Sequence, residues 1–299
     1  MRKLAIKLGI SLIAIAYILL FRIDFSRFYS VLKSIHPGWF ALALFLHTFG
    51  YLISGLRWKA ISGKLDIELP LSFYIKSYLV STFFGFFLPS RFGGDVIRIG
   101  DMSSKDEIAS GLSTVFYERV VGLFSLVILG TIAIATSPPK VKGLLIFSLA
   151  VLGSVLLITS VLLLKPGLLL LLPKKGKIGE KIFKTSRSFA RLKSSRLFLK
   201  VLAWSFLLQI NVIIHYWAIG KAVGIEAPLI SYFFLIPTML ILMAIPITFQ
   251  GIGIRDYFAI SVFPLYGAST EQGFLFSSVD LTIAIILAFV GFIVYITRK

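Results

Sequence analysis

The sequence of 299 residues contains no cysteine, which excludes disulfide bonds, thiolate chemistry and cysteine-ligated metal sites. Its three histidines, His36, His47 and His215, lack the spacing of metal ligands, and no serine lies in a recognisable nucleophile elbow. The sequence also lacks a nucleotide-binding motif. We therefore expect no metal, no cofactor and no catalytic residue.

Charged residues are scarce as well, at 15% of the chain, whereas 58% of the residues are hydrophobic. The mean hydropathy is +0.94. A soluble domain is only about half apolar, so it could not bury this much hydrophobic surface. The apolar residues also form long runs, and about 18 apolar residues in a row are what a helix needs to cross a bilayer. The sequence predicts an all-α polytopic membrane protein.

Acidic residues are the rarer charge, with 13 Asp and Glu against 31 Lys and Arg and a net charge of +18. Much of the excess lies in residues 165–200, which hold a single acid, Glu180. Such a loop is typical of the cytoplasmic side and of contact with anionic lipid headgroups. We expect anionic membrane lipids as partners and no nucleic acid. The loop is either a topological anchor with a solvated linker or an amphipathic surface helix near 178–193.

Eight hydrophobic segments can be drawn. They cover residues 4–21, 38–56, 71–88, 115–136, 143–164, 197–219, 229–249 and 274–297. If all eight cross the membrane, the basic loops cannot all be cytoplasmic. Six full spans satisfy the charges if segment three dips in from the cytoplasm and segment seven from outside, as two oppositely oriented re-entrant hairpins. Eight plain spans are the alternative.

The hairpin arrangement places both termini in the cytoplasm and the protein in the cytoplasmic (inner) membrane. Residues 25–36 would then form a short interfacial helix on the outer side. We expect a single transmembrane domain, 1–299, whose halves, 1–164 and 197–299, resemble an inverted repeat joined by the basic loop 165–196. A homo-oligomer is also compatible with the sequence.

Segment three ends in a proline, a pair of glycines and alternating charges. The residues are Pro89, Arg91, Gly93, Gly94, Asp95 and Arg98. Proline stops a helix and paired glycines permit a tight reversal, so a new helix is expected to start near Gly94 or Asp95. Its free N–H groups, beside two arginines, would form an anion site suited to phosphate.

Segment seven repeats this order with Pro246, Gly251, Gly253, Arg255 and Asp256. Matching broken segments in two halves of a membrane protein indicate an inverted repeat with its substrate site between the halves. The alternative is that both motifs are ordinary loops at the membrane surface.

Glu118 and Arg119 open segment four. They either reach the interface as helix-end residues or face the bundle, where each ion needs a partner. For Glu118 the candidate partner is Arg91 or Arg98. Asp280, in segment eight, is either interfacial or a buried partner of Arg255.

In segment six, Gln209, Asn211 and His215 form either a polar stripe facing a cavity or, as we favour, hydrogen bonds between helices. None of these polar residues forms a catalytic constellation.

These motifs resemble the transmembrane region of the lysylphosphatidylglycerol synthase/flippase family. The likeness rests on Pro89 to Arg98, on Glu118, Arg119 and Gly122, and on Pro246 to Arg255, and it covers nearly the whole chain. In bifunctional synthases of this family, this region is thought to flip the aminoacylated lipid between leaflets. The chain has no counterpart of their cytosolic aminoacyl-transferase domain, so the resemblance implies a stand-alone flippase-like protein.

We therefore expect a lipid transporter that moves an anionic phospholipid or a lipid-linked precursor between leaflets. Arg91, Arg98 and Arg255 would hold the charge, the four glycines would let backbone amides approach, and Asp95, Glu118 and Asp256 would orient the arginines or exchange protons. One alternative is a membrane enzyme acting on a lipid-linked phosphate or sugar, with Asp95 or Glu118 as base. The other is an accessory scaffold for an envelope-lipid synthase.

Overall fold

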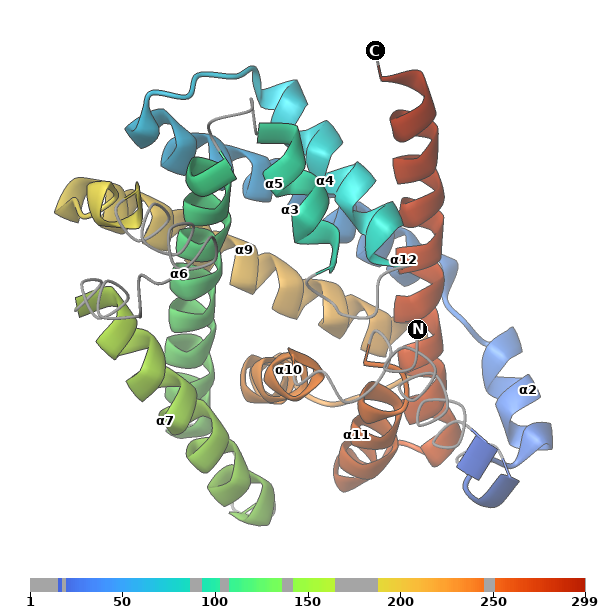
Figure 1. The fold of residues 1–299 in the computed structure, drawn as a ribbon. Helices are drawn as coiled ribbons and strands as arrows, with labels where there is room; N and C mark the ends of the chain where they lie inside the picture. The colour runs from blue at the N-terminus through green and yellow to red at the C-terminus, as the bar shows by residue number, and fades with distance from the viewer. Residues whose placement is uncertain are drawn as a thin grey trace.

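The computed structural model describes residues 16–17, 20–86, 93–102, 108–135, 142–164, 188–244 and 251–298. Its regular elements within these ranges are all helices. They are α2 Phe25–Lys33, α3 Pro37–Ser62, η1 Gly63–Leu65, α4 Leu71–Gly85, α5 Gly93–Met102, α6 Ile108–Ala135, α7 Lys142–Leu164, α9 Ser195–Ala222, α10 Leu229–Ala244, α11 Ile254–Val262, η4 Phe263–Tyr266 and α12 Thr270–Thr297. Figure 1 shows their arrangement.

In the part of the chain that the structure describes, four helices are long and apolar enough to cross a membrane: Pro37–Leu65, Ile108–Ile132, Ser195–Ala222 and Thr270–Thr297. Two shorter apolar stretches accompany them, Leu145–Ile158 and Leu229–Met243. Large apolar side chains such as Ile146 and Leu157 of α7 and Phe289 of α12 are exposed, as expected where a helix meets lipid tails. The all-helical membrane class is confirmed.

Most expected segments from 38 onward appear as helices within a few residues of their drawn bounds, and α6 starts earlier, at Ile108. Local caps explain two of the starts. Ser194 accepts a hydrogen bond from Leu197 N at the start of α9, and Ser269 forms a capping box with Gln272 before α12. The short helix expected in 25–36 is α2, whose N-cap is Asp24. Segment one and most of the basic loop lie outside the described residues.

Two groups of helices follow the same order of lengths. The first, α3 to α6, has 26, 15, 10 and 28 residues. The second, α9 to α12, has 28, 16, 9 and 28 residues, with the short η4 before α12. At 1.5 Å per residue, α5 is only about 15 Å long, about half of the hydrocarbon core.

Helices of the first group pack against helices of the second group. α3 lies against α9, while α4 packs on α12 and α10 packs on α6. In Figure 1, α6 and α12 stand upright on opposite sides; α4 and α5 lie between their upper parts and α10 and α11 between their lower parts. The short helices thus lie between α6 and α12, one pair above the other (Figure 1).

Candidate functional site

A buried carboxylate in α6, Glu118, is the centre of the first polar cluster. It accepts hydrogen bonds from the guanidinium groups of Arg57 in α3 and Arg98 in α5, and from the hydroxyl of Tyr78 in α4. Both arginine side chains are almost fully buried, as is Glu118. A buried ion requires such partners, so Glu118 joins four helices by satisfying two arginine charges. Arg98 is thus one of the two partners predicted for Glu118.

The guanidinium of Arg98 is held on several sides. Its Cζ lies 4.2 Å from the centre of the Trp58 ring and 3.9 Å from that of Tyr78. A second bond runs from Arg98 Nη1 to Asp95 Oδ1, at 3.1 Å. Cation–π contact and ion pairing together fix this side chain in place.

Asp95, near the start of α5, is also bound by Arg119 of α6. Arg119 Nε donates to Asp95 Oδ2 and Arg119 Nη2 donates to Asp95 Oδ1, both at 3.0 Å, which makes a bidentate pair. The backbone approaches closely here, because a Cβ on Gly94 would lie 2.3 Å from the carbonyl oxygen of Ser81 in α4. Only glycine lets α5 begin against α4 at this point.

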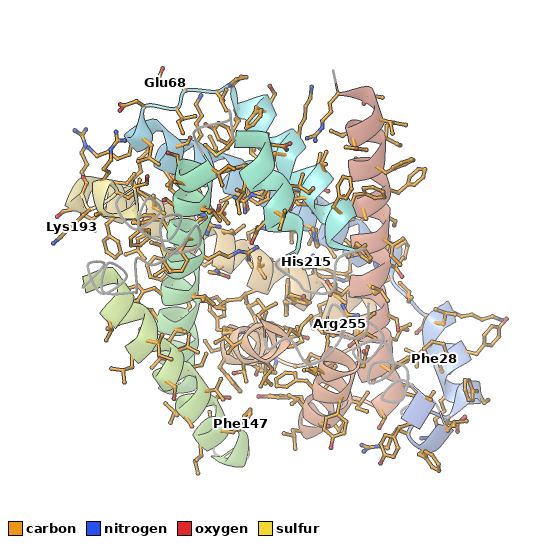
Figure 2. All side chains as sticks on the ribbon, in the orientation of Figure 1. Phe28, Glu68, Phe147, Lys193, His215 and Arg255 are labelled. Carbon is orange, nitrogen blue, oxygen red and sulfur yellow. The ribbon has the colours of Figure 1, made fainter. Side chains whose placement is uncertain are left out.

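The second cluster is centred on Asp280 of α12. Arg255 Nη1 of α11 donates to Asp280 Oδ2 at 2.6 Å, and the Tyr216 hydroxyl of α9 donates to the same oxygen at 3.2 Å. Of the two interpretations of Asp280, the structure supports the buried partner of Arg255. Figure 2 shows His215 and Arg255 in the middle of the bundle, away from Lys193 and Phe147 at its margins.

His215 of α9 completes the second cluster. Its Nε2 lies 3.4 Å from Asp280 Oδ1, and its Nδ1 lies 2.9 Å from the backbone oxygen of Ala43 in α3. The ring of His47, also in α3, meets the His215 ring edge to face at a centroid distance of 4.9 Å. Sequence spacing gives no sign of this group, because it forms only when α3, α9 and α12 pack together.

Ligand atoms of His47, His215 and Asp280 lie within 4.8 Å of one another, a grouping of the kind that can hold a metal ion. Arg255, however, already forms an ion pair with Asp280. A divalent ion would lie beside that guanidinium charge, which opposes its binding. We therefore treat these residues as a hydrogen-bonded ion cluster.

Glycines shape the start of α11. Gly251 and Gly253 have φ values of +77° and +90°, a region that favours glycine. Asp256 Oδ2 accepts a hydrogen bond from Gly253 N at 2.7 Å, so Asp256 caps this helix. A new helix therefore follows each break, at Gly93 and at Ile254.

A cavity of about 280 Å³ lies between the two clusters. Arg119 and Asp95 line it from one side, and Arg255 and Asp280 from the other. The remaining lining comes from α3, α4, α5, α9, α10 and α12 and includes His47, Tyr51, Tyr78, Ser81, Thr82, Gly94, Tyr216 and Met243. Charged side chains from both broken segments thus face one shared cavity.

Several predicted site residues take other positions. Arg98 and Glu118 are buried behind the cavity lining, and Asp256 is engaged at the α11 cap. Pro89, Arg91 and Pro246 lie outside the described residues. Gln209 and Asn211 donate to the backbone oxygens of Gly122 and Leu46, so the favoured interpretation as interhelical hydrogen bonds is right for both.

Four contributors were not predicted: Arg57, Tyr78, His47 and Tyr216. An arginine within the apolar α3 was the one available signal, since a charge inside a membrane helix calls for a partner.

The family model for the lysylphosphatidylglycerol synthase TM region matches residues 4–293. The chain belongs to this family. The resemblance seen in the sequence is therefore confirmed, and the protein is a multi-pass membrane protein of a lipid-related family. Comparisons with the curated proteins and with the solved structures give no match.

Proposed function

We propose that this family member moves an anionic lipid between the leaflets of the cytoplasmic membrane, with the lipid headgroup in the central cavity. The observation that carries the proposal is the cavity itself, which Arg119 and Arg255 line from opposite clusters. Guanidinium groups suit phosphate because they donate two parallel hydrogen bonds. Acyl chains would remain in the bilayer, against apolar helix surfaces.

The contacts of α4 and α5 support the re-entrant arrangement. Ser77 in α4 donates to Asp101 near the end of α5 at 2.7 Å, while Gly94 at the start of α5 lies against Ser81. The two helices are therefore antiparallel, and neither is long enough to span. We infer that they dip into the membrane and return to the same side, and that α10 and α11 do so from the opposite side.

Ion pairs between the ends of different segments support the proposed orientation. Arg298, next to the C-terminus, binds Asp101 at 2.9 Å, and Arg191, at the end of the basic loop, binds Asp66 after α3 at 3.1 Å. These pairs join segments that the charge distribution assigns to the cytoplasm. The helix lengths follow the same order in the two groups, which favours an inverted repeat. In transporters built in this way, a central site opens alternately to the two sides of the membrane.

The alternative of a membrane enzyme gains no support from the geometry. Asp95 and Glu118, its candidate bases, each accept hydrogen bonds from two arginines. A general base needs a free lone pair within reach of the substrate proton.

The test is a leaflet-exchange assay with purified protein in liposomes. Headgroup-labelled phosphatidylglycerol, phosphatidylcholine and a polyprenyl phosphate are the probes. We expect translocation of an anionic probe, at least about tenfold slower after Arg255→Ala, since a charge-assisted hydrogen bond contributes about 1.5–3 kcal/mol. Arg196→Ala, at an exposed position in α9, is the matched control and should retain the wild-type rate.

Arg255→Lys keeps a charge at the site and guards against a variant that does not fold. If wild-type protein leaves every probe in its original leaflet, the transport proposal fails. A recovered probe with a changed mass would favour the enzyme. Exchange that is equal in all variants would contradict the role of the cavity and favour the accessory scaffold.

A further inference from the structure

The two polar clusters occupy corresponding positions in the two helix groups. Glu118 lies ten residues after the first residue of α6, Ile108, and Asp280 lies ten after the first residue of α12, Thr270. Each carboxylate binds an arginine from the short helix that follows a break, Arg98 or Arg255. The sequence places each of these arginines nine residues after its proline.

A third basic side chain contacts each carboxylate from the first long helix of its group. Arg57 lies twenty residues after Pro37, the start of α3, and His215 lies twenty residues after Ser195, the start of α9. Arg57 binds Glu118 and His215 lies against Asp280. The clusters therefore differ in one respect: an arginine that is always charged has a histidine as its counterpart, and histidine gains or loses a proton near neutral pH.

The contacts of His215 leave a place for one more proton, between its Nε2 and Asp280. Nδ1 faces a backbone carbonyl oxygen, which only accepts, so its hydrogen is committed to Ala43. Nε2 then faces Asp280 Oδ1, and an ionised carboxylate also only accepts. A neutral imidazole would leave two lone pairs facing each other. A proton at Nε2 removes this repulsion, and His215 then carries a positive charge.

Several titratable or charged groups lie near His215 and would influence whether it binds a proton. His47 faces it from α3, Asp280 from α12 with Arg255 of α11 behind, and Tyr216 is its neighbour on α9. From α10, Tyr232 is the titratable residue, and α6 contributes Arg119 on the far side of the cavity.

Among the described residues around the cavity, the fixed charges balance. Four arginines, Arg57, Arg98, Arg119 and Arg255, stand against four carboxylates, Asp95, Glu118, Asp256 and Asp280. Among these described residues, an anionic headgroup therefore brings a charge with no fixed counter-charge, and a protonated His215 supplies one. His47 lines the cavity, and its ring contacts the His215 ring. A protonatable group therefore lies between His215 and the cavity.

We propose that His215 takes up one proton when the cavity takes up one anionic headgroup, so that the proton and the lipid cross the membrane together. This inference rests on the proposed transport function and supplies its energy source. Because binding free energies are reciprocal, a proton that favours the anion is itself bound more tightly in the presence of the anion. A proton and a singly charged phosphodiester carry no net charge between them.

The experiment imposes gradients across liposomes that contain the protein and labelled phosphatidylglycerol, a phosphodiester whose charge stays constant near neutral pH. With one proton per lipid, a gradient of one pH unit should drive accumulation of up to about tenfold in one leaflet. A potassium diffusion potential should drive none, because the pair is neutral. His215→Gln and His215→Arg should both lose the response to pH, whereas His36→Gln, at an exposed position, should keep it.

A second readout does not depend on transport. Nitrogen NMR of ring-labelled histidine should show a ring with two N–H groups whose population rises when phosphatidylglycerol replaces phosphatidylcholine in nanodiscs, and His215→Gln should remove this signal. The labelled protein also reports whether the variants fold.

Translocation that occurs but ignores the pH gradient, together with histidine signals that ignore the lipid, overturns the inference and leaves the transport proposal intact. Loss of translocation with a chelator and its return with zinc would also overturn the inference, because a metal ion would then occupy the site. If no lipid is translocated, both proposals fall.

Discussion

The Glu118 cluster and the Asp280 cluster are built on the same plan but have different surroundings. Both carboxylates are buried, with side chains 3% and 8% exposed. Glu118 is surrounded by two arginines and lies behind the cavity lining, whereas Asp280 lines the cavity and has one arginine and a histidine. From this difference we propose that the first cluster holds the scaffold together and the second meets the substrate.

The largest effect should follow from Glu118→Gln. This change leaves Arg57 and Arg98 buried without their carboxylate, and breaking such a pair costs about 3–5 kcal/mol. Asp280→Asn leaves only one arginine, Arg255, without its carboxylate, and Arg255 still lies near Asp256 and lines a polar cavity. This change should therefore lower the stability less. Thermal unfolding of both variants in the same detergent measures the difference. A greater loss for Asp280→Asn would refute the assignment of scaffold and working site.

An intermediate effect is expected from Arg57→His, which gives the first cluster the basic residue of the second. Glu118 favours the protonated imidazole in the folded state, so the folded protein binds more protons than the unfolded chain. Stability is therefore greatest at low pH and falls as the pH rises from about 6 to 8, by about 1–2 kcal/mol.

Unfolding temperatures across this pH range provide the measurement. Arg57→Lys is the matched control, because it shortens the side chain without introducing titration near neutral pH. A flat profile for Arg57→His would show that this position does not sense the charge of Glu118.

The smallest effect on stability should come from Arg119→Ala. Its side chain is 44% exposed, Asp95 keeps its bond to Arg98, and solvent-exposed ion pairs contribute about 0–1 kcal/mol. Lipid translocation should nevertheless slow, since Arg119 lines the cavity. Arg98, the other arginine that binds Asp95, is fully buried. The Arg98→Ala variant should therefore unfold at a much lower temperature than the Arg119→Ala variant. Equal unfolding temperatures for the two variants would contradict this division.

The sequence by itself determined the membrane class, most of the helices and the two breaks. These follow from local causes: apolar runs long enough for a bilayer, a proline that ends a helix, and glycines where the next helix begins. It also named Arg98, beside Arg91, as a candidate partner for Glu118, and a pairing with Arg255 as one of two interpretations of Asp280, because an ion inside a membrane helix requires a counter-charge.

Only the tertiary structure decided which residues line the cavity and which support it from behind. Arg57 meets Glu118 across 61 residues of sequence, and His215 meets Asp280 across 65. No local pattern encodes such contacts, since the packing of α3 on α6 and of α9 on α12 brings them together. The clusters that looked alike as Pro, Gly and Arg motifs became different when packing gave one an arginine and the other a histidine, a residue whose charge can change.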